Sequence, residues 1–125
     1  MSSDSGQAAF NGAVLTLVRV DILQQKISQY ALLKDFEMWL TTLKHLKREI
    51  SPYLKETEYE EINNKIIELD KIKWIVIDEQ GRRKVVEELE PKVEGLLDDI
   101  TVLSQKYMFK AGILMAIKEL EEDYD

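Results

Sequence analysis

Residues 73–91, KWIVIDEQGRRKVVEELEP, decide the fold of this 125-residue chain. If the stretch forms a helix, a turn and a second helix, the protein is a plain helical bundle. If it forms a β-hairpin that follows helices, the bundle acquires the outline of a winged DNA-binding module. The apolar spacing and the residue types within the stretch point in different directions.

The apolar spacing favours helices. Over residues 86–107 apolar side chains recur at alternating steps of three and four, which is the period of an amphipathic helix. A strand at the start of this run would have no reason to share the phase of the helix that follows. Lys84 and Glu88 would also form an i,i+4 pair in a helix. Helix–turn–helix is therefore the preferred prediction, with residues 78–81 as the turn.

The residue types favour a hairpin. Residues 74–77, Trp-Ile-Val-Ile, are all types enriched in strands. The loop that follows would place Gly81 at the left-handed position of a hairpin turn. Pro91 suits the first turn of a helix better than its interior. Because a lone two-stranded hairpin is marginally stable, a β-hairpin over residues 73–87 stays the alternative.

Three helical segments precede this stretch. The helix over residues 36–50 has apolar residues at helical spacing and ends at Ser51-Pro52, because proline disfavours α geometry in the residue before it. The apolar stripe before it is interrupted by two glutamines, so we predict a break between two helices near Ser28. Thr57 and Glu60 have the spacing of a capping box and would begin the next helix.

These patterns predict an all-α protein, a bundle of four to five helices in a single domain over residues 1–125, with residues 1–7 disordered. The hydrophobic share of 45% and the charged share of 33% are typical of a folded chain. A continuous helix over residues 86–117 would be roughly 45 to 50 Å long. A compact globule of this size is only about 35 Å across, so the bundle is elongated or that helix bends.

The charge balance disfavours polyanions as partners. The net charge is −7, and residues 51–125 carry eleven Lys and Arg against nineteen Asp and Glu. Such a field repels nucleic acid and anionic lipid. The longest uncharged run, residues 5–18, is too short to span a bilayer, and the first residues lack the positive segment of a secretory signal. We therefore expect a cytoplasmic protein without membrane contact.

Few residues could carry catalysis. The chain has no cysteine and one histidine, His45, which lacks the Glu-x-x-His pattern of a metal site in a helical bundle. The sequence thus predicts no metal, no cofactor and no catalytic residue, and leans against an enzyme. A magnesium-dependent hydrolase is the third alternative, with Glu58, Glu61, Glu87 and Glu90 as the only paired acids that could serve it.

A basic cluster at the turn supports a second interpretation. Arg82, Arg83 and Lys84 are candidate phosphate contacts, because a wing built from residues 73–87 would present them to a nucleic acid backbone. The preceding helix, which a winged fold would place in the DNA groove, is acidic. A nucleic-acid-associated regulator is therefore the alternative rather than the preferred function.

The C-terminal helix predicts an interface. Residues 107–120, YMFKAGILMAIKEL, are apolar on every side of a helix, so this helix must be buried on more than one face. A two-fold homodimer is the commonest way to cover such a surface. The preferred function is a non-enzymatic interaction or assembly module whose partners are a second copy and possibly another protein. The expected contact residues are Phe109, Gly112, Ile113, Met115, Ala116 and Leu120.

Overall fold

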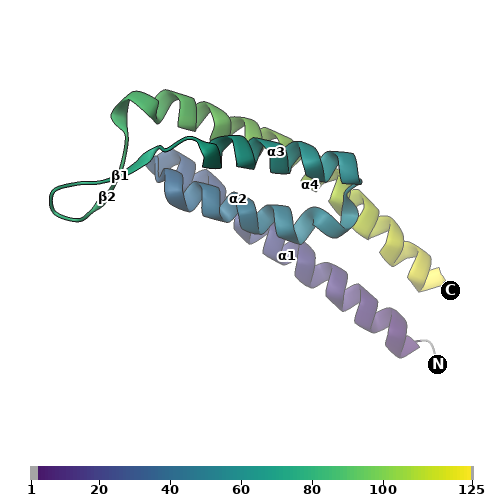
Figure 1. The fold of residues 1–125 in the computed structure, drawn as a ribbon. Helices are drawn as coiled ribbons and strands as arrows, with labels where there is room; N and C mark the ends of the chain where they lie inside the picture. The colour runs from purple at the N-terminus through teal and green to yellow at the C-terminus, as the bar shows by residue number, and fades with distance from the viewer. Residues whose placement is uncertain (1–2, 125) are drawn as a thin grey trace.

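The protein consists of four helices and a small hairpin (Figure 1). The structure is a computed structural model that describes residues 3–124, and it describes side chains for residues 12, 14–110 and 112. The predicted all-α bundle is confirmed. The elements are α1 (Ser3–Leu33), α2 (Phe36–Ile50), α3 (Glu56–Lys71), β1 (Ile75–Ile77), β2 (Arg83–Val85), α4 (Glu90–Tyr124) and the one-turn 3-10 helices η1 (Ser51–Tyr53) and η2 (Glu87–Leu89).

The stretch at 73–91 forms a β-hairpin, so the preferred helix–turn–helix prediction is wrong. β1 and β2 pair antiparallel, with Ile75 opposite Val85. The loop is held by the Asp78 carboxylate, which accepts hydrogen bonds from the backbone N–H groups of Gln80 and Arg82 at 2.9 and 2.8 Å. Gly81 has a φ of 77°, which a residue without a Cβ adopts without strain. The β-favouring side chains and the loop chemistry thus outweigh the shared apolar phase.

The break between the first two helices lies at Lys34, not near Ser28. Lys34 has a positive φ of 56°, and the Asp35 side chain caps α2 by accepting the Met38 N–H at 3.3 Å. The glutamines that suggested the earlier break are exposed on α1 and interrupt no core contact. The predicted disorder of residues 1–7 falls partly on residues 1 and 2, outside the described part, and α1 begins at Ser3.

Helix α3 begins slightly earlier than its predicted cap. It starts at Glu56, and the Glu58 carboxylate accepts the backbone N–H of Lys55 at 2.8 Å. The capping pair, Lys55 and Glu58, thus lies two residues before the predicted pair, Thr57 and Glu60. The carboxylate also lies at the positive end of the helix dipole, where it is favoured.

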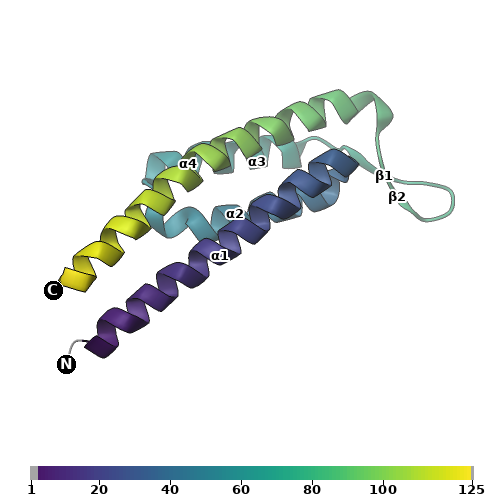
Figure 2. The same cartoon turned by 180° about the vertical axis from the view of Figure 1, so that it is seen from behind.

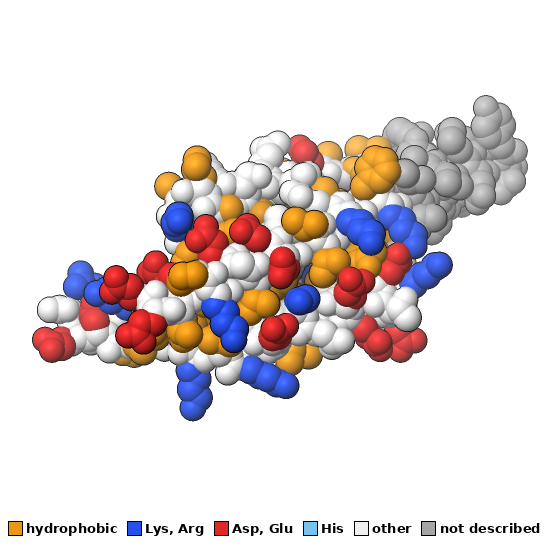
Figure 3. All heavy atoms as spheres, turned by 90° about the horizontal axis from the view of Figure 1, so that it is seen from above, with side chains coloured by type: hydrophobic (Ala, Val, Ile, Leu, Met, Phe, Trp, Pro, Cys, Tyr) orange, Lys and Arg blue, Asp and Glu red, His pale blue; other side chains and the backbone are white. Residues whose placement is uncertain are grey.

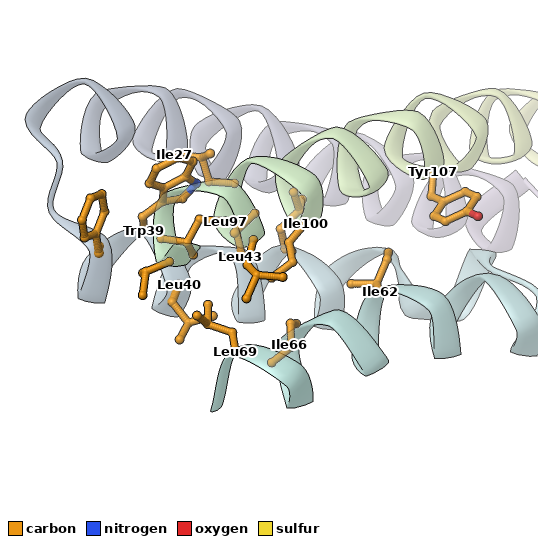
Figure 4. Close-up of a cluster of buried hydrophobic side chains, with 14 of the residues drawn as sticks. Ile27, Trp39, Leu40, Leu43, Ile62, Ile66, Leu69, Leu97, Ile100 and Tyr107 are labelled. Atoms are coloured by element: carbon orange, nitrogen blue, oxygen red, sulfur yellow. The ribbon is translucent and has the colours of Figure 1, made fainter. Parts of the chain in front are cut away.

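The core is shared by all four helices, as the close-up in Figure 4 shows. Helix α2 contributes most, because its buried residues recur at helical spacing along one face. Ile62, Ile66 and Leu69 of α3 pack from the other side. The residues with no exposed surface at all are Leu43, Leu46, Ile50, Ile62, Leu69, Val93, Leu97, Ile100 and Ser104.

Two helices are much longer than the other two, so the molecule is elongated. α1 and α4 contain 31 and 35 residues, against 15 and 16 for α2 and α3. At 1.5 Å per residue the long pair spans about 46 and 52 Å and the short pair about 22 and 24 Å. The free halves of α1 and α4, residues 3–18 and 111–124, project together beyond the four-helix body (Figures 1 and 2). We call these two segments the arm.

Candidate interaction surface

The predicted contact residues lie at the base of the arm and along it. Phe109 is 72% exposed at the base, the largest exposure of a big hydrophobic side chain on the described part of α4. Gly112 is partly buried, and a Cβ placed there would lie 3.9 Å from Leu17 Cδ2 of α1. The other four, Ile113, Met115, Ala116 and Leu120, lie on the arm segment of α4, and their side chains fall outside the described residues.

A second apolar surface lies on α1. Val14, Leu15, Val18 and Ile22 are between 38% and 54% exposed and follow one another at helical spacing on one face. Val20, whose side chain is 6% exposed, points to the opposite side and into the core. We call these four exposed residues the α1 stripe.

The sequence reasoning missed the meaning of the α1 stripe. In the sequence, Leu15, Val18 and Ile22 hold one apolar face of the helix that precedes the two glutamines. The structure buries Val20 and Ile27 instead, on the side of α1 that packs between α2 and α4. The signal available in the sequence was that α1 has two apolar faces, of which the neighbouring helices cover only one.

A groove between the two long helices adjoins these surfaces. It measures about 550 Å³ and is mainly apolar, with Leu17 and Val20 of α1 facing Met108, Phe109 and Gly112 of α4; Asp21 and Gln24 complete its lining. Figure 3 shows that acidic and basic side chains are interspersed over the face of the body that is seen from above. Exposed apolar side chains that adjoin an apolar groove are a feature of contact surfaces, so this region is the candidate for one.

A polar cluster holds α4 to α3 at the base of the arm. Lys110 Nζ lies 2.7 Å from Glu58 Oε2, and the Tyr107 hydroxyl donates a hydrogen bond to Glu61. The ammonium of Lys110, together with the Lys55 N–H, lowers the pKa of Glu58 below its ordinary value. The hydrogen bond to Glu61, with burial, raises the pKa of Tyr107 to about 12. The cluster fixes the point from which the arm projects.

The Tyr107 hydrogen bond predicts a loss of stability in alkaline solution. The pKa of the Tyr107 hydroxyl rises from 10.0 in an ordinary tyrosine to about 12 in the folded protein. The stabilisation is therefore complete below pH 10 and disappears as the pH rises through about 12. Chemical denaturation at several pH values should show the wild type more stable than Tyr107→Phe, with a difference that shrinks over this interval. A difference independent of pH would contradict the assignment.

The candidate phosphate contacts lie on the hairpin, and two of them are already engaged. Arg82 Nε lies 3.0 Å from Asp78 Oδ2, and Arg83 Nε lies 3.0 Å from Glu37 Oε2 on α2. Lys84 is exposed and forms no salt bridge with a described residue. To bind a phosphate, each arginine would have to exchange a carboxylate for it.

The acidic pairs considered for magnesium are far apart. Glu61 contacts α4 at Tyr107, whereas Glu90 begins α4, and 17 residues of helix between positions 90 and 107 correspond to about 25 Å. Glu58 contacts Lys110, close to Tyr107 on α4, whereas Glu87 lies in η2, just before Glu90. Among the described residues no three His, Asp or Glu side chains gather as metal ligands.

Comparison of the chain with models of protein families, with curated proteins and with solved structures finds no significant match. No helix in the described part of the chain combines the length and the hydrophobicity needed to cross a lipid bilayer.

Proposed function

We propose that the protein is a helical assembly module that associates with a second copy of itself through the arm, the α1 stripe and the adjoining groove. The single observation that carries this proposal is the α1 stripe, which leaves four large apolar side chains in water beside an apolar groove. Burial of apolar surface contributes roughly 25 cal/mol per Å², so covering this region would stabilise a complex. Such a module acts by binding and needs no catalytic site. Its expected location is the cytoplasm.

The shape of the arm favours a second copy as the partner. The body has four helices around one core, whereas the arm has only two. Two arms related by a two-fold axis would supply four helices, which is the number that closes a bundle core. The same surface would be used by both copies, as in most homodimers.

The charge distribution also permits self-association. A chain of net charge −7 repels its own copy over most of its surface. The first half of α1 is the exception, because residues 5–18 carry no charged side chain. Two copies can approach through this segment without placing like charges against one another.

Sedimentation equilibrium of matched variants tests the proposal. The wild type should sediment at twice the chain mass of 14.6 kDa. Leu15→Glu should weaken the dimer by about a hundredfold or more, because it buries an unpaired carboxylate in an apolar contact. Leu32→Glu is the control: Leu32 lies on the same helix and is 83% exposed, but near the far end from the arm.

The outcomes separate the candidates clearly. A dimer that Leu15→Glu dissociates into a folded monomer, while Leu32→Glu leaves it intact, supports the arm as the interface. A wild-type monomer at all concentrations would overturn the proposal. Equal sensitivity of both variants would place the contact elsewhere on α1.

The hairpin favours a second candidate, a nucleic-acid-associated regulator. A wing-like hairpin follows α3 and exposes Lys84 beside the two arginines. Such binding would weaken steeply with salt and vanish when Arg82, Arg83 and Lys84 are all changed to glutamate. Against it, α3 carries Glu56 and Glu58 in its first turn, and both arginines are paired with carboxylates.

A further inference from the structure

A second groove lies between α1 and α2 at the base of the arm. It measures about 340 Å³ and is lined by Arg19, Ile22 and Leu23 of α1 and by His45, Arg48 and Glu49 of α2. Ile22 belongs to the α1 stripe, so this groove continues the surface proposed for self-association. Its floor is apolar and its rim is polar.

The rim of this groove is basic in an otherwise acidic protein. Among the described residues, neither Arg19 nor Arg48 forms a salt bridge, and Glu49 pairs with neither of them. Two guanidinium groups against one carboxylate leave an excess of positive charge, and the exposed imidazole of His45 stands beside them. A guanidinium binds a carboxylate through paired N–H donors, so this rim suits an acidic segment.

The chain itself contains such a segment at the end of α4. Residues 119–125, ELEEDYD, include five acidic residues, and the last turn of α4 has no basic residue. Negative charge at a helix C-terminus is unfavourable, because it adds to the negative end of the helix dipole. A basic surface placed against this end would relieve the repulsion.

Because the arm is long, the acidic end of α4 and the basic groove can meet only between two copies of the chain. Within one chain the acidic end of α4 lies at the tip of the arm, whereas the basic groove lies at its base (Figures 1 and 2). The 16 residues from Ser3 to Arg19 on α1 correspond to about 24 Å. When two arms overlap antiparallel along their whole length, the tip of each arm reaches the base of the other.

We infer that the groove of Arg19, His45 and Arg48 in one copy receives the acidic C-terminal segment of α4, residues 119–125, from a second copy. This inference rests on the proposed self-association and adds its geometry: the two arms run antiparallel, and each dimer contains two such contacts. The apolar surfaces contribute the affinity, and the charged contacts set the register of the arms.

Charge reversal tests the contact, with sedimentation equilibrium at low salt as the measurement. The double substitution Arg19→Glu/Arg48→Glu should raise the dimer Kd by about tenfold or more, because attraction becomes repulsion at both contacts. Glu121→Lys/Glu122→Lys should have a similar effect. The combination of all four changes should restore the dimer, since opposite charges again face each other. Added salt should shrink each of these differences.

Lys26→Glu is the control for the change of net charge. Lys26 is exposed on α1 outside the groove, and the substitution alters the charge in the same direction. It should leave the dimer Kd within about twofold of the wild type. Circular dichroism of each variant confirms that the monomer is folded, so loss of association is not confused with unfolding.

The results distinguish the groove contact from the proposed self-association on which it rests. A wild-type dimer whose Kd is unaffected by reversal of the two arginines would overturn the groove contact and leave self-association standing. Failure of the fourfold variant to recover the dimer would also overturn the contact. A wild-type monomer would overturn both.

Discussion

Replacing Trp39 by alanine is expected to lower the free energy of unfolding by about 3 to 5 kcal/mol. Trp39 is 2% exposed and belongs to the core cluster, in which Figure 4 labels it. Its ring centroid is 6.3 Å from that of Phe36, and its Nε1–H donates to Thr101 Oγ1 at 2.9 Å. One side chain therefore joins α2 to α4 both by packing and by a hydrogen bond. The total free energy of unfolding of a domain is only about 5 to 15 kcal/mol, so the variant should lose a large share of its stability.

Two further variants separate the contributions of Trp39 in urea denaturation. Trp39→Phe keeps an aromatic ring and leaves the Thr101 hydroxyl without its donor, so it should cost about 1 to 2 kcal/mol. Met38→Ala, at the neighbouring 40% exposed position, should change stability by less than about 0.5 kcal/mol. A loss below about 1 kcal/mol for Trp39→Ala would contradict the central place of this residue in the core.

Replacing Trp74 by alanine is expected to cost about 3 to 5 kcal/mol and to release the hairpin from the body. Trp74 is 6% exposed and belongs to the core cluster. Its carbonyl accepts the Val86 N–H at 2.8 Å, so the base of the hairpin closes directly at the buried indole. The strands beyond it are only three residues each, too short to persist without this anchor.

Limited proteolysis and denaturation together check the role of Trp74. The variant should be cut faster within residues 75–85 as well as being less stable. Ile77→Ala is the matched control, because Ile77 lies on β1 but is 62% exposed, and its truncation should be nearly neutral. Cleavage elsewhere in the chain, with the hairpin still resistant, would show that Trp74 stabilises the bundle without anchoring the strands.

α2 and most of α4 could be predicted from the sequence because their apolar residues are both periodic and numerous. The stripe on α2 from Phe36 to Ile50 is buried, as its spacing predicts. On α4 the residues from Val93 to Tyr107 that follow the predicted stripe are likewise buried or half-buried. Over this many turns, the spacing of the apolar residues fits a helix and does not fit the alternation of a strand.

The hairpin could not be predicted in the same way, because its strands are too short to show a period of two. Val86 and Leu89 continue the phase of α4 although they lie before and within the one-turn helix η2. Their partial burial on the same side of the body produces the continuous apolar run that suggested a helix. The signals that pointed correctly were local, namely the strand-forming residues and Pro91, which lies in the first turn of α4.

The proposed interaction surface could be predicted only in part. The exposed position of Phe109 agrees with the contact surface expected on α4, and the homodimer itself stays a prediction. The α1 stripe and the basic groove depend on which face of α1 is covered by α2 and α4. That choice is a tertiary feature that a periodic pattern does not contain.

The pairing of α1 with α4 also has a consequence during synthesis on the ribosome. α1 is made before α4, and the intervening chain takes several seconds at about 5 to 20 residues per second. During that interval Val20 and Leu17 lack the α4 side chains that line the groove with them. The apolar side chains that α1 turns toward this groove therefore stay uncovered until α4 has been synthesised.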